Sequence, residues 1–171
     1  FVGTDMFWGD DRLDDALEEL PHHDRAVTVL DQSEAVAEGI RTYPGLPHRL
    51  ELVATKGRVR FVNDSKATNA DSTARALVCY DRILWIAGGQ AKEGGIEPLA
   101  EFFPRIAEAL LIGRDAPILA ATLARHNVPH RILGTLEAAT AEAWRLAKGP
   151  SLGEAQDIVV LLSPACASWD Q

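Results

Sequence analysis

The chain has 171 residues, 47% of them hydrophobic, which suits one folded domain with some additional sequence; no apolar run approaches the roughly 18 residues of a membrane helix. The net charge of −8 comes from residues 1–38, which hold 11 Asp or Glu against 2 Arg, while the remainder holds 14 acidic and 15 basic residues. This distribution excludes the basic face of a general nucleic-acid-binding protein and indicates a boundary near residue 38. The acidic start lacks the basic region of a signal peptide, and Cys79 and Cys166 lack metal-site spacing, so we expect reduced thiols in a cytoplasmic protein.

The first 49 residues have an irregular pattern. An acidic helix is possible over residues 11–20, and residues 31–40 predict a short helix that Gly39 ends. The turn-rich segment RTYPGLPHR at residues 41–49 contains two prolines and predicts a linker. We expect this linker to act as a hinge between domains.

From Leu50 onward, strands alternate with helices. A strand pair is predicted around Gly57, and Asn69, Asp115 and Thr135 are predicted helix caps. The predicted elements, in chain order, are strands at 50–54 and 59–64, a helix at 70–79, a strand at 82–89, a short helix at 97–103, a strand at 108–113, a helix ending at 126, a strand at 130–134, a helix ending at 148 and a strand at 157–164. This alternation predicts an α/β fold, with a mostly parallel sheet covered by helices on both faces. Trp85 and Trp144 lie on apolar patterns and are expected in the core.

Polar residues follow three of these strands. The segments are DSKATNADS at residues 64–72, QAKEGG at 90–95 and SPACASWDQ at 163–171; the strand at 108–113 is followed by Arg114 and Asp115. Because open α/β sheets bind ligands outside the carboxyl ends of their strands, these segments predict the functional edge.

The first segment has the residue types of a nucleotide site. Asp64 directly follows an apolar strand, where its carboxylate would accept hydrogen bonds from ribose hydroxyls. Lys66 offers a positive charge for phosphate or carboxylate, and Thr68 and Asn69 offer donors at a helix start. The alternative is that Asp64, Thr68 and Asn69 are only turn and cap residues.

The other two segments suit anionic ligands. Gly88 and Gly89 allow close backbone approach, Lys92 would reach an anionic group, and Ser163 and Ser168 would hold a carboxylate. The alternative for Lys92 is a solvated side chain on a flexible loop, and the order of a Walker A loop is absent. We disfavour Cys166 as a nucleophile because no well-placed histidine base accompanies it, and we interpret His22 and His23 as surface residues.

Four strings together resemble, in order and spacing, the C-terminal domain of the Mur ligases: YPGLPHRLE, FVNDSKATNADST, IAGGQAKEGG and LLSPACASWDQ. The resemblance covers residues 31–171, and NDSKATN with SPACASWDQ is similar to the members that add D-glutamate. It implies a Rossmann-like domain at 41–171, truncated at its end, that closes over a central ATPase domain. Residues 1–40 would be a fragmentary remnant of that central domain.

The resemblance also implies the reaction. ATP phosphorylates the L-alanine carboxylate of UDP-N-acetylmuramoyl-L-alanine, and the amine of D-glutamate then attacks the acyl phosphate, releasing ADP and phosphate. Mg²⁺ bridges phosphate and protein, and catalysis is positioning with charge neutralisation. A cytoplasmic monomer acting in peptidoglycan precursor synthesis, without nucleic acid or membrane partners, is implied.

Site residues are carried over from the matching strings. Arg49 would reach the ATP phosphates with His48 in support, Asp64 would hold the ribose, and Lys66 would orient its loop or the nucleotide; Arg49, His48 and Lys66 are the catalytic candidates. For D-glutamate, the resemblance implies Thr68, Lys92, Ser168 and the backbone of Trp169, where the family usually has a smaller apolar residue. No metal ligand is implied within this sequence.

The sequence departs from the family by lacking the UDP-binding domain, the P-loop and most of the central domain. We therefore expect these 171 residues not to catalyse ligation by themselves. A related Mur-type ligase that adds another amino acid, or a nucleotide-binding or regulatory module without catalysis, are the alternatives.

Overall fold

The computed structural model of the protein describes residues 34–39, 41–152 and 157–167. The chain divides into two compact units, Phe1–Pro44 and Gly45–Gln171. In the first unit, residues 34–39 and 41–42 are helical, and Tyr43 N donates to Gly39 O at 2.9 Å. Gly39 therefore lies within a helical turn, and the prediction that it ends the helix is wrong. None of the described helices is both long and apolar enough to cross a bilayer.

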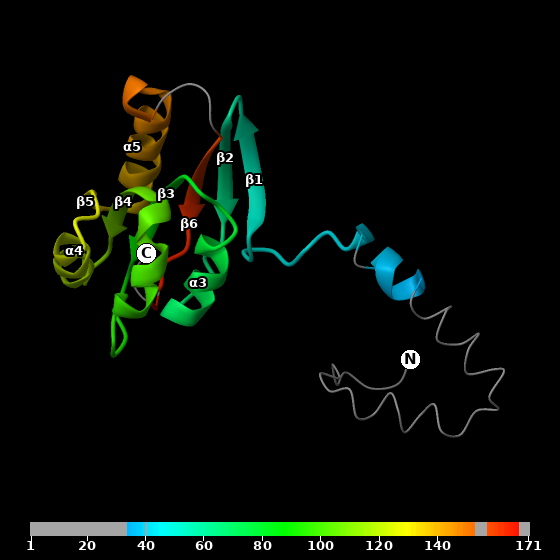
Figure 1. The fold of residues 1–171 in the computed structure, drawn as a ribbon, viewed down its shortest axis with the longest axis horizontal. Helices are drawn as coiled ribbons and strands as arrows, with labels where there is room; N and C mark the ends of the chain where they lie inside the picture. The colour runs from blue at the N-terminus through cyan, green and yellow to red at the C-terminus, as the bar shows by residue number, and fades with distance from the viewer. Residues whose placement is uncertain (1–33, 40, 153–156, 168–171) are drawn as a thin grey trace. The chain divides into compact units, whose positions relative to one another are not determined.

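The second unit contains a six-stranded sheet in the order β1-β2-β6-β3-β4-β5 (Figure 1). The strands are β1 (Glu51–Lys56), β2 (Val59–Asn63), β3 (Ile83–Gly88), β4 (Ile106–Ile112), β5 (His130–Gly134) and β6 (Ile158–Leu162). The strand pair predicted around Gly57 is present, with β1 and β2 antiparallel, and the other neighbouring pairs are parallel. The predicted mostly parallel sheet is confirmed.

The connecting helices are α3 (Ala70–Leu77), η1 (Glu97–Arg105), α4 (Ala116–Arg125), α5 (Leu136–Lys148) and η2 (Pro150–Leu152). Two predicted caps are present: the Asn69 side chain accepts from Ser72 N at 2.9 Å, and Thr135 Oγ1 accepts from Ala138 N at 3.2 Å. Asp115 occupies the N-cap position of α4 but makes no side-chain cap bond, so that predicted cap is wrong. η1 is a 3₁₀ helix containing Pro104, whose ring is incompatible with a continuing α-helix.

The two faces of the sheet have separate cores. Along β3, Trp85 and its alternate neighbours pack with α3, η1 and α4, whereas Leu84 and Ile86 pack against α5. The connections from β2 to β3, β3 to β4 and β4 to β5 all run in one direction along the sheet, and the connection from β5 to β6 runs back. Because such crossovers are right-handed, this reversal places α5 on the opposite face from the other helices. Trp85 is fully buried as predicted, whereas Trp144 is only partly buried against the second core.

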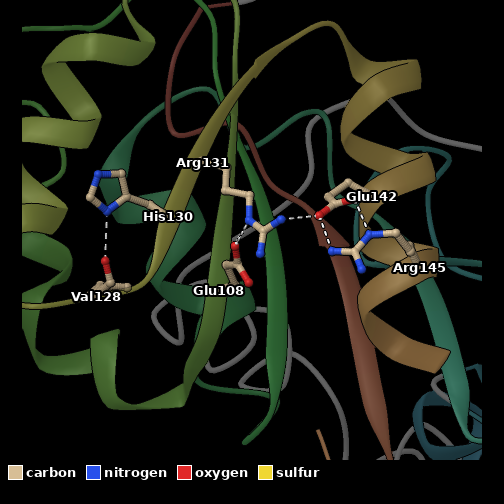
Figure 2. A network of polar contacts seen from close by, with 6 residues as sticks. All are labelled: Glu108, Val128, His130, Arg131, Glu142 and Arg145. Atoms are coloured by element: carbon tan, nitrogen blue, oxygen red, sulfur yellow. Dashed lines mark hydrogen bonds and ion pairs between the residues drawn. The ribbon is translucent and has the colours of Figure 1, made fainter. Parts of the chain in front are cut away.

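An ion-pair network fastens α5 to the outer strands of the sheet (Figure 2). Arg131 on β5 contacts Glu108 on β4 and Glu142 on α5, and Arg145 contacts Glu142 at 2.7 Å. The arginines are substantially exposed, so each pair contributes little stability. The network links α5 to β4 and β5 through one arginine, Arg131.

Candidate functional site

The described residues of the three polar segments, 64–72 after β2, 163–167 after β6 and 90–95 after β3, lie at one edge of the sheet, because these strands are direct neighbours (Figure 1). Parallel strands bring their carboxyl ends to the same edge, and β2, β6 and β3 are parallel to one another. β4 is the next neighbour, so Arg114 and Asp115 join the same edge. These residues therefore form one continuous row across four strands.

Backbone hydrogen bonds tie the loops of this edge together. Ala165 N, after β6, donates to Ala67 O, after β2, at 3.0 Å. Gln90, after β3, and Ala167 exchange two hydrogen bonds of 2.8 and 3.0 Å, as in an isolated antiparallel bridge. These bonds join the loops that follow β2, β6 and β3 into one assembly.

Two glycines make this close assembly possible. Gly88 and Gly89 have φ values of 132° and 131°, and a Cβ on Gly88 would lie 1.9 Å from Ile112 O. A Cβ on Gly89 would lie 2.4 Å from Ala167 O. The sequence predicted close approach of a ligand here, but the close approach that the structure shows is to neighbouring backbone.

Asp64 is the centre of a buried polar cluster at the end of β2. The residue is only 7% exposed. Its Oδ2 accepts a hydrogen bond from Ser163 Oγ at 2.9 Å, and its Oδ1 accepts one from Leu50 N at 3.3 Å. Ser163 Oγ also lies 3.1 Å from Thr73 Oγ1, and Trp85 Nε1 donates to Ser163 O at 2.8 Å. Ser163 is completely buried and its hydroxyl donates to Asp64. The prediction that Ser163 holds a carboxylate ligand is therefore not supported, because the hydroxyl is not accessible.

The environment of Asp64 affects its charge. Burial raises the pKa of the carboxyl above its usual value, opposed by the hydrogen bonds from Ser163 and Leu50 and by the Arg49 guanidinium. A carboxylate has about four lone-pair sites, and the protein contacts above use two of them. Asp64 can therefore accept further hydrogen bonds from a ligand.

A pocket of about 420 Å³ opens beside Asp64. Its lining joins residues that are distant in sequence: Arg49, Leu50, Asp64, Ala67, Asn69, Asp71, Ser72, Arg75 and Ala76. Arg49 and Asp64, both predicted for nucleotide binding, thus face the same cavity. A larger hollow of about 1060 Å³ beside α5 has mainly apolar walls and contains none of the predicted site residues.

His48 is held beside this pocket in a strained conformation. It has a φ of 65°, a region that residues other than glycine rarely adopt. Glu51 Oε2 accepts from His48 N at 2.8 Å, Asn63 Nδ2 lies 2.9 Å from His48 Nδ1, and Lys66 N donates to His48 O at 3.2 Å. Sequence reasoning did not identify Glu51 and Asn63 as supports, because their contacts depend on the pairing of β1 with β2.

The loop after β3 carries Lys92, which is exposed. Gly95 N donates to Lys92 O at 3.0 Å, closing a turn, and Ala91 N donates to Asp115 Oδ2 at 2.9 Å. The sequence predicted Asp115 only as a helix cap and did not predict this contact. The position of Asp115 after β4, the strand next to β3, was the signal that could have indicated it.

Cys166 follows β6 and belongs to the core on the Trp85 face of the sheet. Its thiol is buried, and burial, followed by the Asp115 carboxylate, raises its pKa to about 11, while the Lys92 ammonium acts in the opposite direction. A thiol with this pKa is protonated near neutral pH, and the thiolate is the nucleophilic form. The environment therefore favours the structural interpretation of Cys166.

The remaining predicted residues are less constrained. Thr68 is partly buried and Lys66 exposed, on the loop that joins β2 to α3, with Thr68 N donating to Lys66 O at 3.0 Å. Ser168, Trp169, His22 and His23 lie outside the described residues. Across residues 34–39, 41–152 and 157–167, no group of three or more His, Cys, Asp or Glu residues is placed to hold a metal ion.

The sequence matches a protein family over most of this unit. Residues 48–166 match the family described as Mur ligase, glutamate ligase domain. The chain is 58% identical over 136 residues to a UDP-N-acetylmuramoylalanine–D-glutamate ligase of Rhizobium meliloti (strain 1021), which covers 80% of this chain and 28% of that protein. It is 52% identical over 139 residues to a protein of the same name from Rhodospirillum rubrum, covering 81% and 28%. The chain thus spans less than a third of the length of these curated relatives.

Solved structures share the fold at low sequence identity. A UDP-N-acetylmuramate-alanine ligase, MurC, from Thermotoga maritima aligns with a TM-score of 0.52 and 13% identity, over 86% of this chain and 36% of that one. A bifunctional folylpolyglutamate synthase/dihydrofolate synthase from Yersinia pestis aligns with a TM-score of 0.52 and 21% identity, over 82% and 35%. These similarities concern the fold alone.

Proposed function

Because the chain belongs to the Mur ligase family, through its glutamate ligase domain, we propose that it acts within an ATP-dependent ligase that joins D-glutamate to UDP-N-acetylmuramoyl-L-alanine. The observation that carries this proposal is the 52–58% identity, over about 80% of the chain, with relatives named for that reaction. The reaction would form an amide bond through an acyl phosphate, with ADP and phosphate as the other products. Residues 41–171 would form the C-terminal domain, and residues 1–40 part of a central ATPase domain.

We assign the pocket beside Asp64 to the nucleotide. The spare acceptor sites of the Asp64 carboxylate would take the ribose hydroxyls, and Arg49, which lines the same cavity, would neutralise phosphate charge. His48 would support Arg49, since its backbone conformation is fixed by Glu51. Lys66 would orient the nucleotide or the loop that follows β2. Its amide N donates to His48 O, which connects this loop to His48.

We assign the Lys92 loop to D-glutamate. Lys92 would pair with the side-chain carboxylate, a role supported by its exposure and by the turn that fixes its carbonyl. Thr68, Ser168 and the backbone of Trp169 would bind the same amino acid. The Gln90–Ala167 bridge supports this grouping, because it holds the residue before Ser168 against the Lys92 loop.

The chemistry that these residues supply is orientation and charge compensation. Positive groups such as Arg49 and Lys66 would stabilise charge on the transferred phosphoryl group, and Lys92 would orient the incoming amino acid, which lowers the entropic cost of attack. When bound with ATP, Mg²⁺ would supply positive charge against the phosphates, and we assign it no ligand among the described residues. A cytoplasmic, monomeric enzyme without nucleic-acid or membrane partners belongs to the same proposal.

The decisive experiment measures phosphate release by the full-length product of the gene. The protein is given Mg²⁺, ATP and UDP-N-acetylmuramoyl-L-alanine, with D-glutamate, L-glutamate, D-aspartate or L-lysine. We expect release that requires D-glutamate and is not supported by the other three. The 171-residue chain, assayed in parallel, is expected to show no ligation.

The outcomes separate the alternatives. Release that depends on another of these amino acids would identify a related ligase with a different acceptor specificity. Nucleotide binding that requires Asp64, without release under any condition, would indicate a binding or regulatory module. Either result would contradict the D-glutamate assignment and leave the fold unaffected.

A further inference from the structure

Asp115 occupies a helix-capping position but does not cap its helix. It directly precedes α4, yet its carboxylate makes no hydrogen bond to the amides of that helix. Asp at this position commonly accepts from the first-turn amides, and the cap contributes to helix stability. The carboxylate instead accepts hydrogen bonds from residues outside that helix.

Those partners belong to the loop after β3. Ala91 N donates to Asp115 Oδ2 at 2.9 Å, and Asp115 N donates to Gly89 O at 3.1 Å. Asp115 therefore holds the loop at two points, once through its side chain and once through its backbone. The side-chain bond falls on the residue immediately before Lys92.

The opposite side of the same loop is held by backbone alone. Gln90, between the two residues that Asp115 contacts, exchanges two hydrogen bonds with Ala167. Removing the Asp115 carboxylate would leave this bridge intact, while Ala91 N and Arg114 Nε would lose this acceptor. Within the loop, the loss would then be confined to the segment that carries Lys92.

The charge of Asp115 is well maintained. Arg114 Nε donates to Oδ1 at 3.0 Å, and this bond, followed by the bond from Ala91, lowers the pKa of the carboxyl below its usual value. The side chain is only 18% exposed. An ionised acceptor makes a stronger hydrogen bond to an amide than a neutral one.

We infer that Asp115 is a positioning residue for Lys92, holding the Ala91 amide so that the lysine ammonium is presented to the carboxylate of the acceptor amino acid. This inference rests on the proposed function, which assigns Lys92 to D-glutamate. Asp115 itself does not contact substrate in this scheme. Its effect is on where Lys92 is placed.

The test uses the full-length product with Asp115→Ala, Asp115→Asn and a matched control, Asp81→Ala. Asp81 also pairs with an arginine, Arg105, at 2.5 Å, but it precedes β3 and so lies at the opposite edge of the sheet. We expect Asp115→Ala to raise the KM for D-glutamate about tenfold, with the KM for ATP changed less than about twofold. Asp115→Asn keeps an oxygen acceptor and is expected to recover most of the loss.

A second measurement does not depend on activity. Hydrogen exchange of a peptide containing Ala91 is expected to accelerate about tenfold in Asp115→Ala and to be unchanged in Asp81→Ala. Equal loss for ATP and D-glutamate, or unchanged exchange at Ala91, would overturn the inference. A wild-type protein without D-glutamate dependence would overturn the proposed function and this role with it, whereas a dependent wild type with unaltered Asp115→Ala kinetics would overturn the inference alone.

Discussion

The Asp64 cluster and the Lys92 loop lie at the same edge of the sheet, after β2 and β3, the two strands that flank β6. The protein holds them in different ways. Asp64 is buried and is fixed by Ser163, whose own hydroxyl lies against Thr73. Lys92 is exposed, and the contacts that fix its loop are made by neighbouring backbone atoms and by one carboxylate. The first region has its side-chain geometry set before a ligand arrives, and the second only its backbone.

This difference separates two requirements of the proposed reaction. A buried, hydrogen-bonded acceptor loses little entropy on binding, which suits a fixed site for the ribose of the proposed nucleotide. An exposed lysine on a tethered loop can adjust to the amino acid before attack. Substitutions in the Asp64 cluster should therefore act broadly, and those in the Lys92 loop selectively.

The largest expected effect comes from the end of β3, where the Lys92 loop begins. Gly88→Ala would place a Cβ 1.9 Å from the backbone oxygen of Ile112, and we expect it to lower the free energy of unfolding by about 3 kcal/mol. Gly94→Ala, in the Lys92 loop, has a φ of 83° but nothing within 4 Å of the added Cβ, and should cost about 1 kcal/mol. Denaturant unfolding measures both, and equal losses would contradict the distinction between a packed edge and an open loop.

Removal of the buried carboxylate should nearly abolish nucleotide use. We expect Asp64→Ala to reduce kcat/KM for ATP about 100-fold, because charged hydrogen bonds to two ribose hydroxyls are lost. Asp71 lines the same pocket but is exposed, and Asp71→Ala is the control, expected to change the value less than about threefold. Phosphate release at varied ATP gives the comparison; similar losses would mean that the pocket attracts ATP only through its general charge.

Two exposed lysines provide a reciprocal test. Lys92→Ala is expected to raise the KM for D-glutamate about tenfold, and Lys66→Ala to affect the KM for ATP by about threefold, because an exposed charge contributes less than a buried one. Steady-state kinetics with each substrate varied in turn would resolve the two. If both variants changed the same KM, the assignment of the loops to different substrates would be incorrect.

The smallest effect concerns stability and pH. Because burial raises the pKa of Asp64 in the folded protein, the folded state binds this proton more tightly than the unfolded chain does. The corresponding stability is present below the ordinary Asp pKa and is lost as pH rises through the raised value. Asp64→Asn should therefore unfold about 2 °C higher than wild type at pH 7, and this advantage should shrink toward pH 4. Thermal unfolding at several pH values measures it, and a difference that grows on acidification would have the wrong sign.

The fold was largely predictable because its signals are local. Apolar strands such as residues 83–87, helix caps such as Asn69 and Thr135, and the turn at Gly57 all occur where the sequence places them. The short helix predicted at residues 97–103 is present as η1, and its 3₁₀ geometry, which contains Pro104, was not predicted.

The site was predictable only in outline. Polar residues after strands indicate an edge, but which side chains meet there depends on strand order, and β6 inserts between β2 and β3. This insertion places Ser163 under Asp64, and the order of β3 and β4 brings Asp115 to Ala91. Such contacts between residues 24 or 99 positions apart leave no periodic trace in a single sequence.

The hydrogen bond from Trp85 to Ser163 has an optical consequence. The Trp85 indole is fully buried and donates to Ser163 O, while the Ser163 hydroxyl donates to Asp64. We therefore expect a ligand that hydrogen-bonds to the Asp64 carboxylate to change the surroundings of this fluorophore. Trp144 has a different environment, with the Lys148 ammonium 4.8 Å from its ring centre, and it lines the apolar hollow beside α5. A variant that retains only Trp85 of the four tryptophans would therefore report filling of the pocket without an attached dye, and one that retains only Trp144 would be the reference.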